Sequence, residues 1–246
     1  MRRALVLSAL LGLLTGCAGT PSDPSGTWIN QTAIDAASKS GKLREALLAY
    51  GPNLEWQLDS KSHQASYSNG FEKGDGQLSQ DPSDKKRWQV AFYGSKQEAL
   101  QLDGKQLVQV GGDNWPEQRF VRPEQQPTAQ TPLGATFERA LYGSFLKGTW
   151  VIAEGQGQGS KVNFQPDGRI EGMPNADRYA LCLAGDCAAM TGNNDSIWLQ
   201  QGRQGREYLF QREDDQIELF EAVNRAQADE MPEYQPGQRV WLLKRD

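Results

Sequence analysis

The side chains that could support catalysis are few in this chain and lie far apart. His63 is the only histidine among 246 residues, so a cage of histidines around a metal ion is impossible within one chain. A Ser-His-Asp nucleophile would need the same residue, and no nucleophile-elbow sequence is present. His63 lies in the polar stretch Ser60-Lys61-Ser62-His63-Gln64, which is typical of a solvated turn. We therefore expect no catalysis, no metal and no cofactor.

Two other motifs carry weaker chemical signals. The run Gly155-Gln156-Gly157-Gln158-Gly159 has the glycine content of a phosphate-binding loop, but it lacks the lysine and the helix that follow in such loops. It predicts a flexible hairpin tip. The carboxylates of Asp214 and Asp215 could contribute to a calcium site, but they lie beside a turn, where solvation alone accounts for them.

The three cysteines divide into one near the N-terminus and a close pair, Cys182 and Cys187. A Gly-Asp turn at Gly185-Asp186 separates the pair, and an oxidising compartment would allow a disulfide between two strand ends. Closing so short a loop stabilises a fold by about 2 kcal/mol, which is enough to hold one hairpin. A thiol redox motif would need a two-residue gap, and a metal site would need more ligands.

The N-terminus has the parts of a secretory signal peptide. Arg2 and Arg3 precede an apolar run over residues 4–14 that only Ser8 interrupts. This run is shorter than the roughly 20 residues that a helix needs to cross a bilayer. We therefore expect a cleaved signal and no permanent membrane span.

The segment Leu13-Leu14-Thr15-Gly16-Cys17 resembles the lipobox of bacterial lipoproteins, with leucine three residues before the cysteine and glycine directly before it. The resemblance implies removal of residues 1–16 and attachment of several acyl chains, such as palmitate, to Cys17. Burial of about 0.8 kcal/mol per methylene makes such an anchor stable. Ala18, in place of aspartate, favours the outer membrane, facing the periplasm, by similarity to enterobacterial lipoproteins. The alternative is an ordinary signal-peptidase cut that leaves Cys17 as a thiol.

The chain is acidic, with a formal net charge of −5 and an isoelectric point near 5.1. Loss of Arg2 and Arg3 with the signal would make it more acidic still. An acidic surface argues against nucleic acid as a partner. The longest charge runs, Lys85-Lys86-Arg87 and Glu213-Asp214-Asp215, are short and predict solvated turns.

Two halves of the chain repeat each other. Gly26-Thr27-Trp28 returns as Gly148-Thr149-Trp150, and each copy is followed at a similar distance by Gln-Arg and two apolar residues, at Gln118-Arg119 and Gln238-Arg239. Matched starts, ends and lengths indicate two similar units. We predict a tether over residues 17–25, a first domain over 26–123, a linker over 124–133 and a second domain over 134–246.

Both units have the pattern of antiparallel β structure. Short runs of alternating apolar residues, such as residues 54–58, 88–92 and 217–220, are separated by glycine or Asp-Gly turns. About eight strands per unit can be counted, the number at which a small barrel closes. An apolar stripe with Leu43 and Leu47 predicts one helix over residues 33–50, and a second stripe, Phe137, Leu141 and Phe145, predicts another before the second unit.

A Gly-x-Trp on the first strand and an arginine near the last strand resemble the structural signature of lipocalins and the wider calycin group, which are eight-stranded antiparallel barrels. The resemblance implies that the tryptophan closes the barrel floor and that the arginine stacks on its ring. Trp28 would meet Arg119 or Arg122, and Trp150 would meet Arg239 or Arg245. The expected signature residues are Gly26, Trp28, Arg119, Gly148, Trp150 and Arg239. The helix after the first strand departs from the family order.

We expect two tandem calycin-like β-barrels that serve as a lipid-anchored binding or interaction module for a periplasmic or envelope protein. The alternative is a carrier of a small hydrophobic ligand inside one barrel, an expectation that depends on fold analogy alone. Trp56, Trp88, Trp198 and Trp241 lie in strand patterns, and most of the tryptophans should be core residues. Trp115 lies in a predicted loop and is the candidate contact residue.

Overall fold

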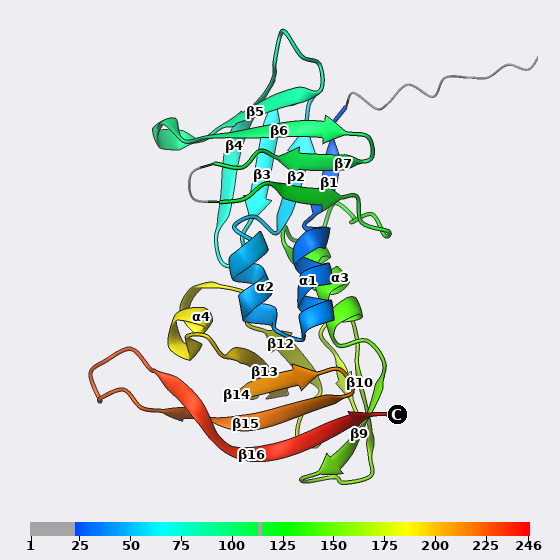
Figure 1. Ribbon diagram of the computed structural model, residues 1–246, viewed down its shortest axis with the longest axis vertical. Helices are drawn as coiled ribbons and strands as arrows, with labels where there is room; N and C mark the ends of the chain where they lie inside the picture. The colour runs from blue at the N-terminus through cyan, green and yellow to red at the C-terminus, as the bar shows by residue number, and fades with distance from the viewer. Residues whose placement is uncertain (1–22, 113–114) are drawn as a thin grey trace, which may run out of the picture.

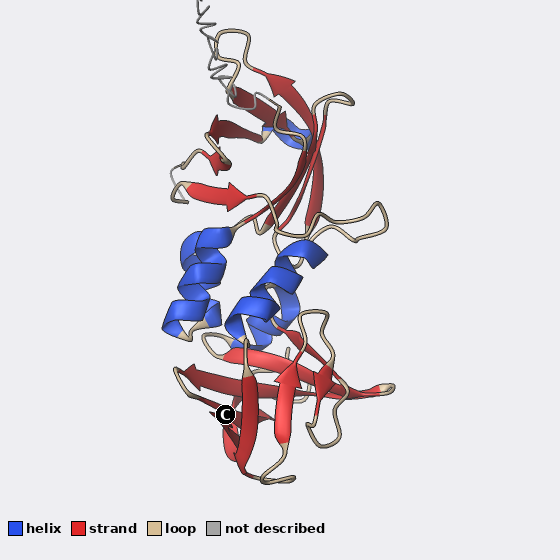
Figure 2. Cartoon of the chain, turned by 90° about the vertical axis from the view of Figure 1, so that its right-hand side faces the viewer, coloured by secondary structure: helices blue, strands red, loops and turns tan. Residues whose placement is uncertain are grey.

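The computed structural model describes residues 23–112 and 115–246. It is mainly β, as predicted, with two antiparallel sheets of eight strands at opposite ends of the long axis. A layer of helices lies between them (Figures 1 and 2). Residues 1–16 and Cys17, on which the signal and anchor predictions depend, lie outside the described residues.

The first sheet is a closed barrel in which every strand pairs with its neighbour in sequence. Pairing of Ile29 with Val121 joins the first strand to the last and closes the barrel. A 3-10 helix, Tyr93–Ser95, connects the fifth and sixth strands. The strands are β1 (Gly26–Ile29), β2 (Glu55–Asp59), β3 (Gln64–Ser68), β4 (Lys73–Gln80), β5 (Arg87–Ala91), β6 (Gln97–Asp103), β7 (Gln106–Gln109) and β8 (Gln118–Val121).

The second sheet has the same up-and-down order. Its two edge strands are adjacent in sequence, and an isolated bridge between Arg169 and Arg178 spans the seam between them. The Tyr179 N–H also donates to Gly168 O at 2.8 Å. The strands are β9 (Thr149–Glu154), β10 (Lys161–Phe164), β11 (Ile170–Glu171), β12 (Arg178–Leu181), β13 (Asp195–Gln201), β14 (Gln204–Glu213), β15 (Gln216–Asn224) and β16 (Tyr234–Arg245).

The helix predicted over residues 33–50 is two helices, α1 (Gln31–Ser40) and α2 (Leu43–Tyr50). The break is at Gly41, which has a left-handed φ of 75° and donates its N–H to Ala37 O at 2.9 Å. This is a glycine C-cap, and a Cβ at this position would collide with the backbone oxygen of Arg212. The single-helix prediction was wrong because the apolar stripe continues across this turn.

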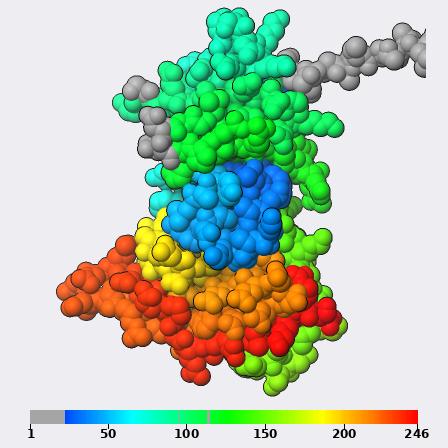
Figure 3. Space-filling model, viewed as in Figure 1, coloured from blue at the N-terminus to red at the C-terminus, as the bar shows by residue number. Residues whose placement is uncertain are grey.

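The predicted helix with Phe137, Leu141 and Phe145 is present as α3 (Ala135–Phe145), and all three side chains are fully buried. They belong to one continuous core with Ile34 of α1, Leu43 of α2 and Trp150 of the second sheet. Helices α1 and α2 therefore follow the first strand of the barrel in sequence but pack with the second sheet. Figure 3 shows their side chains filling the waist between the two sheets.

The first barrel has a separate core made of its own inward-facing side chains. Its members are mostly large aromatic and aliphatic residues, which fill the interior. They are Trp28, Trp56, Leu58, Ala65, Leu78, Trp88, Val90, Leu100, Leu102, Leu107 and Phe120.

Three of the four strand tryptophans predicted for the core are buried, namely Trp56, Trp88 and Trp241. Trp198 is the exception, because 41% of this residue is exposed. Its neighbours Ile197 and Leu199 are both buried, and successive residues of a strand face opposite sides. The outward-facing indole ring covers Gly205, where a Cβ would collide with it.

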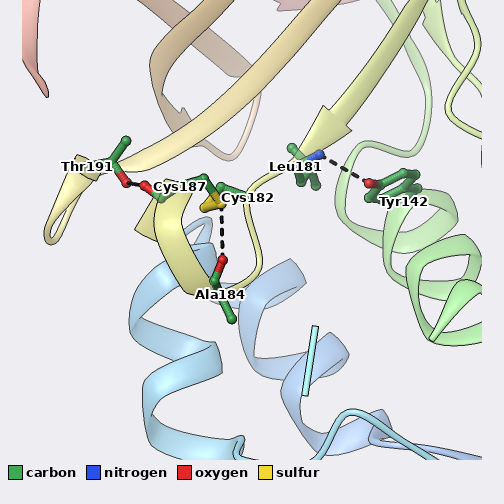
Figure 4. The surroundings of a disulfide bond; sticks show 6 residues. All are labelled: Tyr142, Leu181, Cys182, Ala184, Cys187 and Thr191. Atoms are coloured by element: carbon green, nitrogen blue, oxygen red, sulfur yellow. Dashed lines mark hydrogen bonds between the residues drawn. A yellow bond between two sulfur atoms is a disulfide. The ribbon is translucent and has the colours of Figure 1, made fainter. Parts of the chain in front are cut away.

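The disulfide predicted between Cys182 and Cys187 is present (Figure 4). It does not close a hairpin as expected, because Cys187 lies in a short helix, α4 (Gly185–Thr191), rather than in a second strand. The loop that it closes contacts the first barrel. A Cβ on Gly185 would collide with the ring of Phe71, and Gly70 lies beside Leu183. The disulfide loop is therefore part of the contact between the two units.

Candidate functional site: a cationic groove between the two units

The Gly-x-Trp motif of the first barrel holds an arginine against its tryptophan. The guanidinium carbon of Arg122 lies 4.2 Å from the ring centroid of Trp28. Gly26 has a φ of 116°, and a Cβ there would collide with Arg122 Nη1. The Trp28 Nε1–H donates to Pro24 O at 2.7 Å. The glycine is therefore required both for the backbone conformation and for the space that the guanidinium occupies.

The second motif repeats this geometry. Arg245 lies 4.5 Å from the ring centroid of Trp150, and Gly148, with a φ of 109°, leaves space for the guanidinium. The Trp150 Nε1–H donates to Leu146 O at 3.2 Å. The spacing from tryptophan to stacked arginine agrees between the units to within one residue.

Of the two arginines predicted as alternatives for each tryptophan, Arg122 and Arg245 are the ones that stack, so the choice of Arg119 and Arg239 as signature residues was wrong. Arg119 lies on the outside of the barrel and pairs with Asp103 and Glu117. Arg239 pairs with Glu154 and Glu218. The repeated Gln-Arg motif therefore marks exposed ion pairs, and the stacking arginines follow three and six residues later.

A carboxylate from the first barrel caps the helix that precedes the second sheet. Glu55, on β2, is 2% exposed and accepts a hydrogen bond of 2.8 Å from Phe137 N in the first turn of α3. Residue Gly134 at the cap of α3 supplies no side-chain acceptor. Glu55 therefore satisfies backbone N–H groups that would otherwise be buried without partners. Burial raises the pKa of Glu55, although these N–H groups oppose the rise.

A carboxylate from the second sheet does the same for a helix of the first unit. Asp195, on β13, accepts hydrogen bonds from Leu43 N at 2.8 Å and Arg44 N at 2.6 Å, in the first turn of α2. Lys42 at the cap of α2 supplies no side-chain bond. Burial raises the pKa of Asp195 as well. Each unit therefore caps a helix of the other.

Helix α3 and segments from both units form a groove at the waist of the molecule, with a volume of about 620 Å³. We call it the waist groove. It is lined from four parts of the chain: the junction of β1 and α1, the end of β8 with the residues after it, one face of α3, and the turn after β10. Its lining residues are Ile29, Gln31, Val121, Arg122, Pro123, Glu124, Gln125, Thr136, Arg139, Ala140, Gly143, Ser144, Lys147 and Pro166.

The charges of the waist groove are opposite in sign to the net charge of the chain. Arg122, Arg139 and Lys147 line it, with Glu124 as the one carboxylate. Among the described residues, no ion pair or side-chain hydrogen bond is found for Arg139 or Lys147. Arg122 is held against Trp28, and burial lowers its pKa while Asp23 opposes this. The groove can therefore attract an anionic group through cations that are not already paired.

A second hollow, on the outside of the first barrel, contains His63 together with Ser66 and Asp75. These residue types suggest a nucleophilic triad, but the bonds differ from one. The Ser66 hydroxyl donates to Asp75 at 2.6 Å, and His63 Nδ1 lies 3.3 Å from Leu78 O. No serine–histidine bond joins the described groups, which such a nucleophile requires.

Trp115 lies in the connection between β7 and β8, and 43% of it is exposed. Its backbone oxygen accepts a hydrogen bond of 3.0 Å from Gly112 N. It is not among the residues that line the waist groove. The structure therefore places this candidate contact residue apart from the groove, and its role stays a prediction.

Within residues 23–112 and 115–246, no cluster of three or more histidine, cysteine, aspartate or glutamate side chains could hold a metal ion. The helices of the same residues include none with the length and apolar character that a membrane crossing requires.

Comparisons with protein-family models, with curated proteins and with solved structures found no match to this chain.

The reciprocal caps predict a pH-dependent stability. The pKa values of Glu55 and Asp195 lie above their ordinary values of 4.5 and 3.8, so the folded chain binds more protons than the unfolded chain in the interval above these values. Stability should then fall as the pH rises through this interval. We expect the free energy of unfolding of the native chain to fall, relative to an E55Q/D195N variant, as the pH rises above about 4. Urea titrations at several pH values measure both free energies, and a native chain that becomes more stable relative to the variant as the pH rises would contradict the prediction.

The stacking of Arg122 predicts that its replacement lowers the free energy of unfolding more than replacement of Arg119 does. Arg122→Met keeps most of the aliphatic length but loses the cation–π contact, and should lower the free energy of unfolding by about 1 kcal/mol. Arg119→Met removes exposed ion pairs and should change it by less than about 0.5 kcal/mol. Denaturant unfolding of the two variants provides the comparison. An equal loss in both would argue against the assignment of Arg122.

Proposed function

We propose that this chain is a lipid-anchored lipoprotein of the cell envelope that acts as a binding or interaction module, with the waist groove as its binding site. Cys17 would carry the acyl chains, and the outer membrane, facing the periplasm, is the proposed location. The resemblance of residues 13–17 to a lipobox supports the anchor. Catalysis is not part of the proposal.

The observation that carries the proposal is that the barrels are filled while the waist is open. The first barrel holds three buried tryptophans in its core. A cavity against the core of the second sheet, between Leu146, Phe164 and Phe210, has a volume of only about 10 Å³. This is about the size of one water molecule, whereas pockets for small ligands span roughly 300 to 1,000 Å³. These volumes favour binding in the waist groove over carriage of a hydrophobic ligand inside a barrel.

Site-specific photocrosslinking in native membranes tests this proposal. A photoreactive amino acid in place of Gln125 or Ser144 would lie in the waist groove. We expect each position to yield an adduct of defined mass on irradiation, because a bound partner would lie within contact distance. The adduct is detected by a shift on a denaturing gel and identified by mass spectrometry.

Two matched positions serve as controls. Gln211 is exposed on β14 of the second unit, and Trp115 tests the loop of the first barrel. An adduct at the groove positions and none at position 211 supports the proposal. Adducts only at position 115 would assign the contact to the β7–β8 loop instead. Absence of any groove adduct would contradict the proposed binding site.

A further inference from the structure

The waist groove has the features of a site for an anionic chain. Its two free cations, Arg139 and Lys147, are exposed and unpaired among the described residues, in a chain whose net charge is −5. Arg119 and Arg239, by contrast, are paired with carboxylates. No carboxylate among the described residues forms an ion pair with Arg139 or Lys147, although Glu124 also lines the groove.

Arg139 lies on α3, and Lys147 lies two residues beyond the end of this helix at Phe145. If the helical rise is continued through these two residues, the eight positions between the cations correspond to roughly 12 Å along the axis. The residues between them that line the groove are small, namely Ala140, Gly143 and Ser144. The two cations are therefore separated by a stretch of the groove wall that has only small side chains.

The positions of the cations are fixed by the rest of the fold. Arg245 Nη1 donates to Lys147 O at 2.8 Å while the same guanidinium stacks on Trp150. The first turn of α3, which precedes Arg139, is capped by Glu55. A ligand would thus meet a preformed arrangement rather than one that it must order, which lowers the cost of binding.

An independent observation is a polar group in the groove wall that lacks a partner. Thr136 is 7% exposed and lines the groove, and its Oγ1 has no hydrogen-bond partner among the described residues. A buried hydroxyl without a partner costs free energy. A bound donor or acceptor at this end of the groove could satisfy it after rotation of the side chain.

The remaining lining residues suit a polypeptide. Gln31 and Gln125 carry amides that can both donate to and accept from a peptide backbone. Ile29, Val121 and Pro166 offer apolar contact for alternate side chains. In an extended peptide, residues four apart lie roughly 13 Å apart on one face, which matches the spacing of the two cations.

We propose that the waist groove binds an extended acidic segment of a partner protein, with carboxylates four residues apart meeting Arg139 and Lys147. This inference rests on the proposed function, because it specifies the partner of the same site.

Binding of a defined peptide to the full lipoprotein in detergent micelles tests this. The probe is a fluorescein-labelled eight-residue peptide with glutamates four positions apart, and its counterpart has glutamines at the same positions. We expect the glutamate peptide to bind with an anisotropy change that weakens as salt rises. The affinity of the native chain for the glutamine peptide should be lower by at least about tenfold. The affinity of the R139E/K147E variant for the glutamate peptide should be lower by at least the same factor.

The matched control is K85E/K86E, which makes the same charge change in an exposed turn far from the groove in sequence. It should bind the glutamate peptide as the native chain does. Because Arg139 and Lys147 are exposed and unpaired, the fold should survive their reversal, and circular dichroism checks this. If it does not, R139Q/K147Q replaces the double reversal in the same assay.

Several outcomes would overturn the inference. Equal binding of the glutamate and glutamine peptides, or equal loss in K85E/K86E, would remove the role of the groove cations. A uronic-acid tetramer that binds through Arg139 and Lys147 when the peptide does not would assign the groove to a saccharide. Residues 225–235 of this chain contain Asp229 and Glu233, which are four positions apart. Tightest binding by a peptide of these residues, with self-association that R139E/K147E abolishes, would assign the groove to a second copy of this chain.

The two proposals can fail separately. A photocrosslinked adduct in the groove that R139E/K147E leaves unchanged would keep the binding site and reject its acidic ligand. The lack of any groove adduct would reject the binding site itself, whatever the peptide does.

Discussion

Two carboxylates, the buried Glu55 and the half-buried Asp195, determine how the units of this protein are joined. Glu55 of the first barrel accepts from the first turn of α3, and Asp195 of the second sheet accepts from the first turn of α2. Neither helix has a side-chain cap of its own. Each therefore depends on the opposite unit for an acceptor of the free backbone N–H groups in its first turn. Because both helices share one apolar core with the second sheet, the caps fix the helical layer to both sheets. Helix α3, which Glu55 caps, supplies one wall of the waist groove.

The two units share one structural motif, made of a glycine, a tryptophan and a stacked arginine. In each unit, a glycine with positive φ precedes a tryptophan by two residues. The glycine makes space for a distant arginine that stacks on this tryptophan. Both arginines lie close to the waist groove: Arg122 lines it, and Arg245 holds the backbone of Lys147. The barrel interiors are packed, so the repeated fold serves as a scaffold. The surface between its copies is where we place binding.

Local patterns in the sequence predicted the strands, the barrel type and the disulfide, because these depend on alternation, turn residues and close cysteines. The stacking arginines, Arg122 and Arg245, were predicted only as alternatives, because the repeated Gln-Arg pair at Arg119 and Arg239 was a stronger sequence signal than the single arginines after it. The caps could not be predicted, since Glu55 and Asp195 bind residues 82 and 152 positions away. The groove was missed for the same reason, because its cations and its walls come from separate segments.

Because the caps and the shared core join the helical layer to both sheets, we expect the two units to form a single folded body. Hydrogen exchange of the full chain in increasing urea, followed by mass spectrometry of peptides from β5 and from β14, tests this claim directly. A single cooperative body predicts that both strands lose protection together, at the same urea concentration and with the same free energy of opening. Loss of protection in one strand while the other remains protected would show two independent domains and contradict the account.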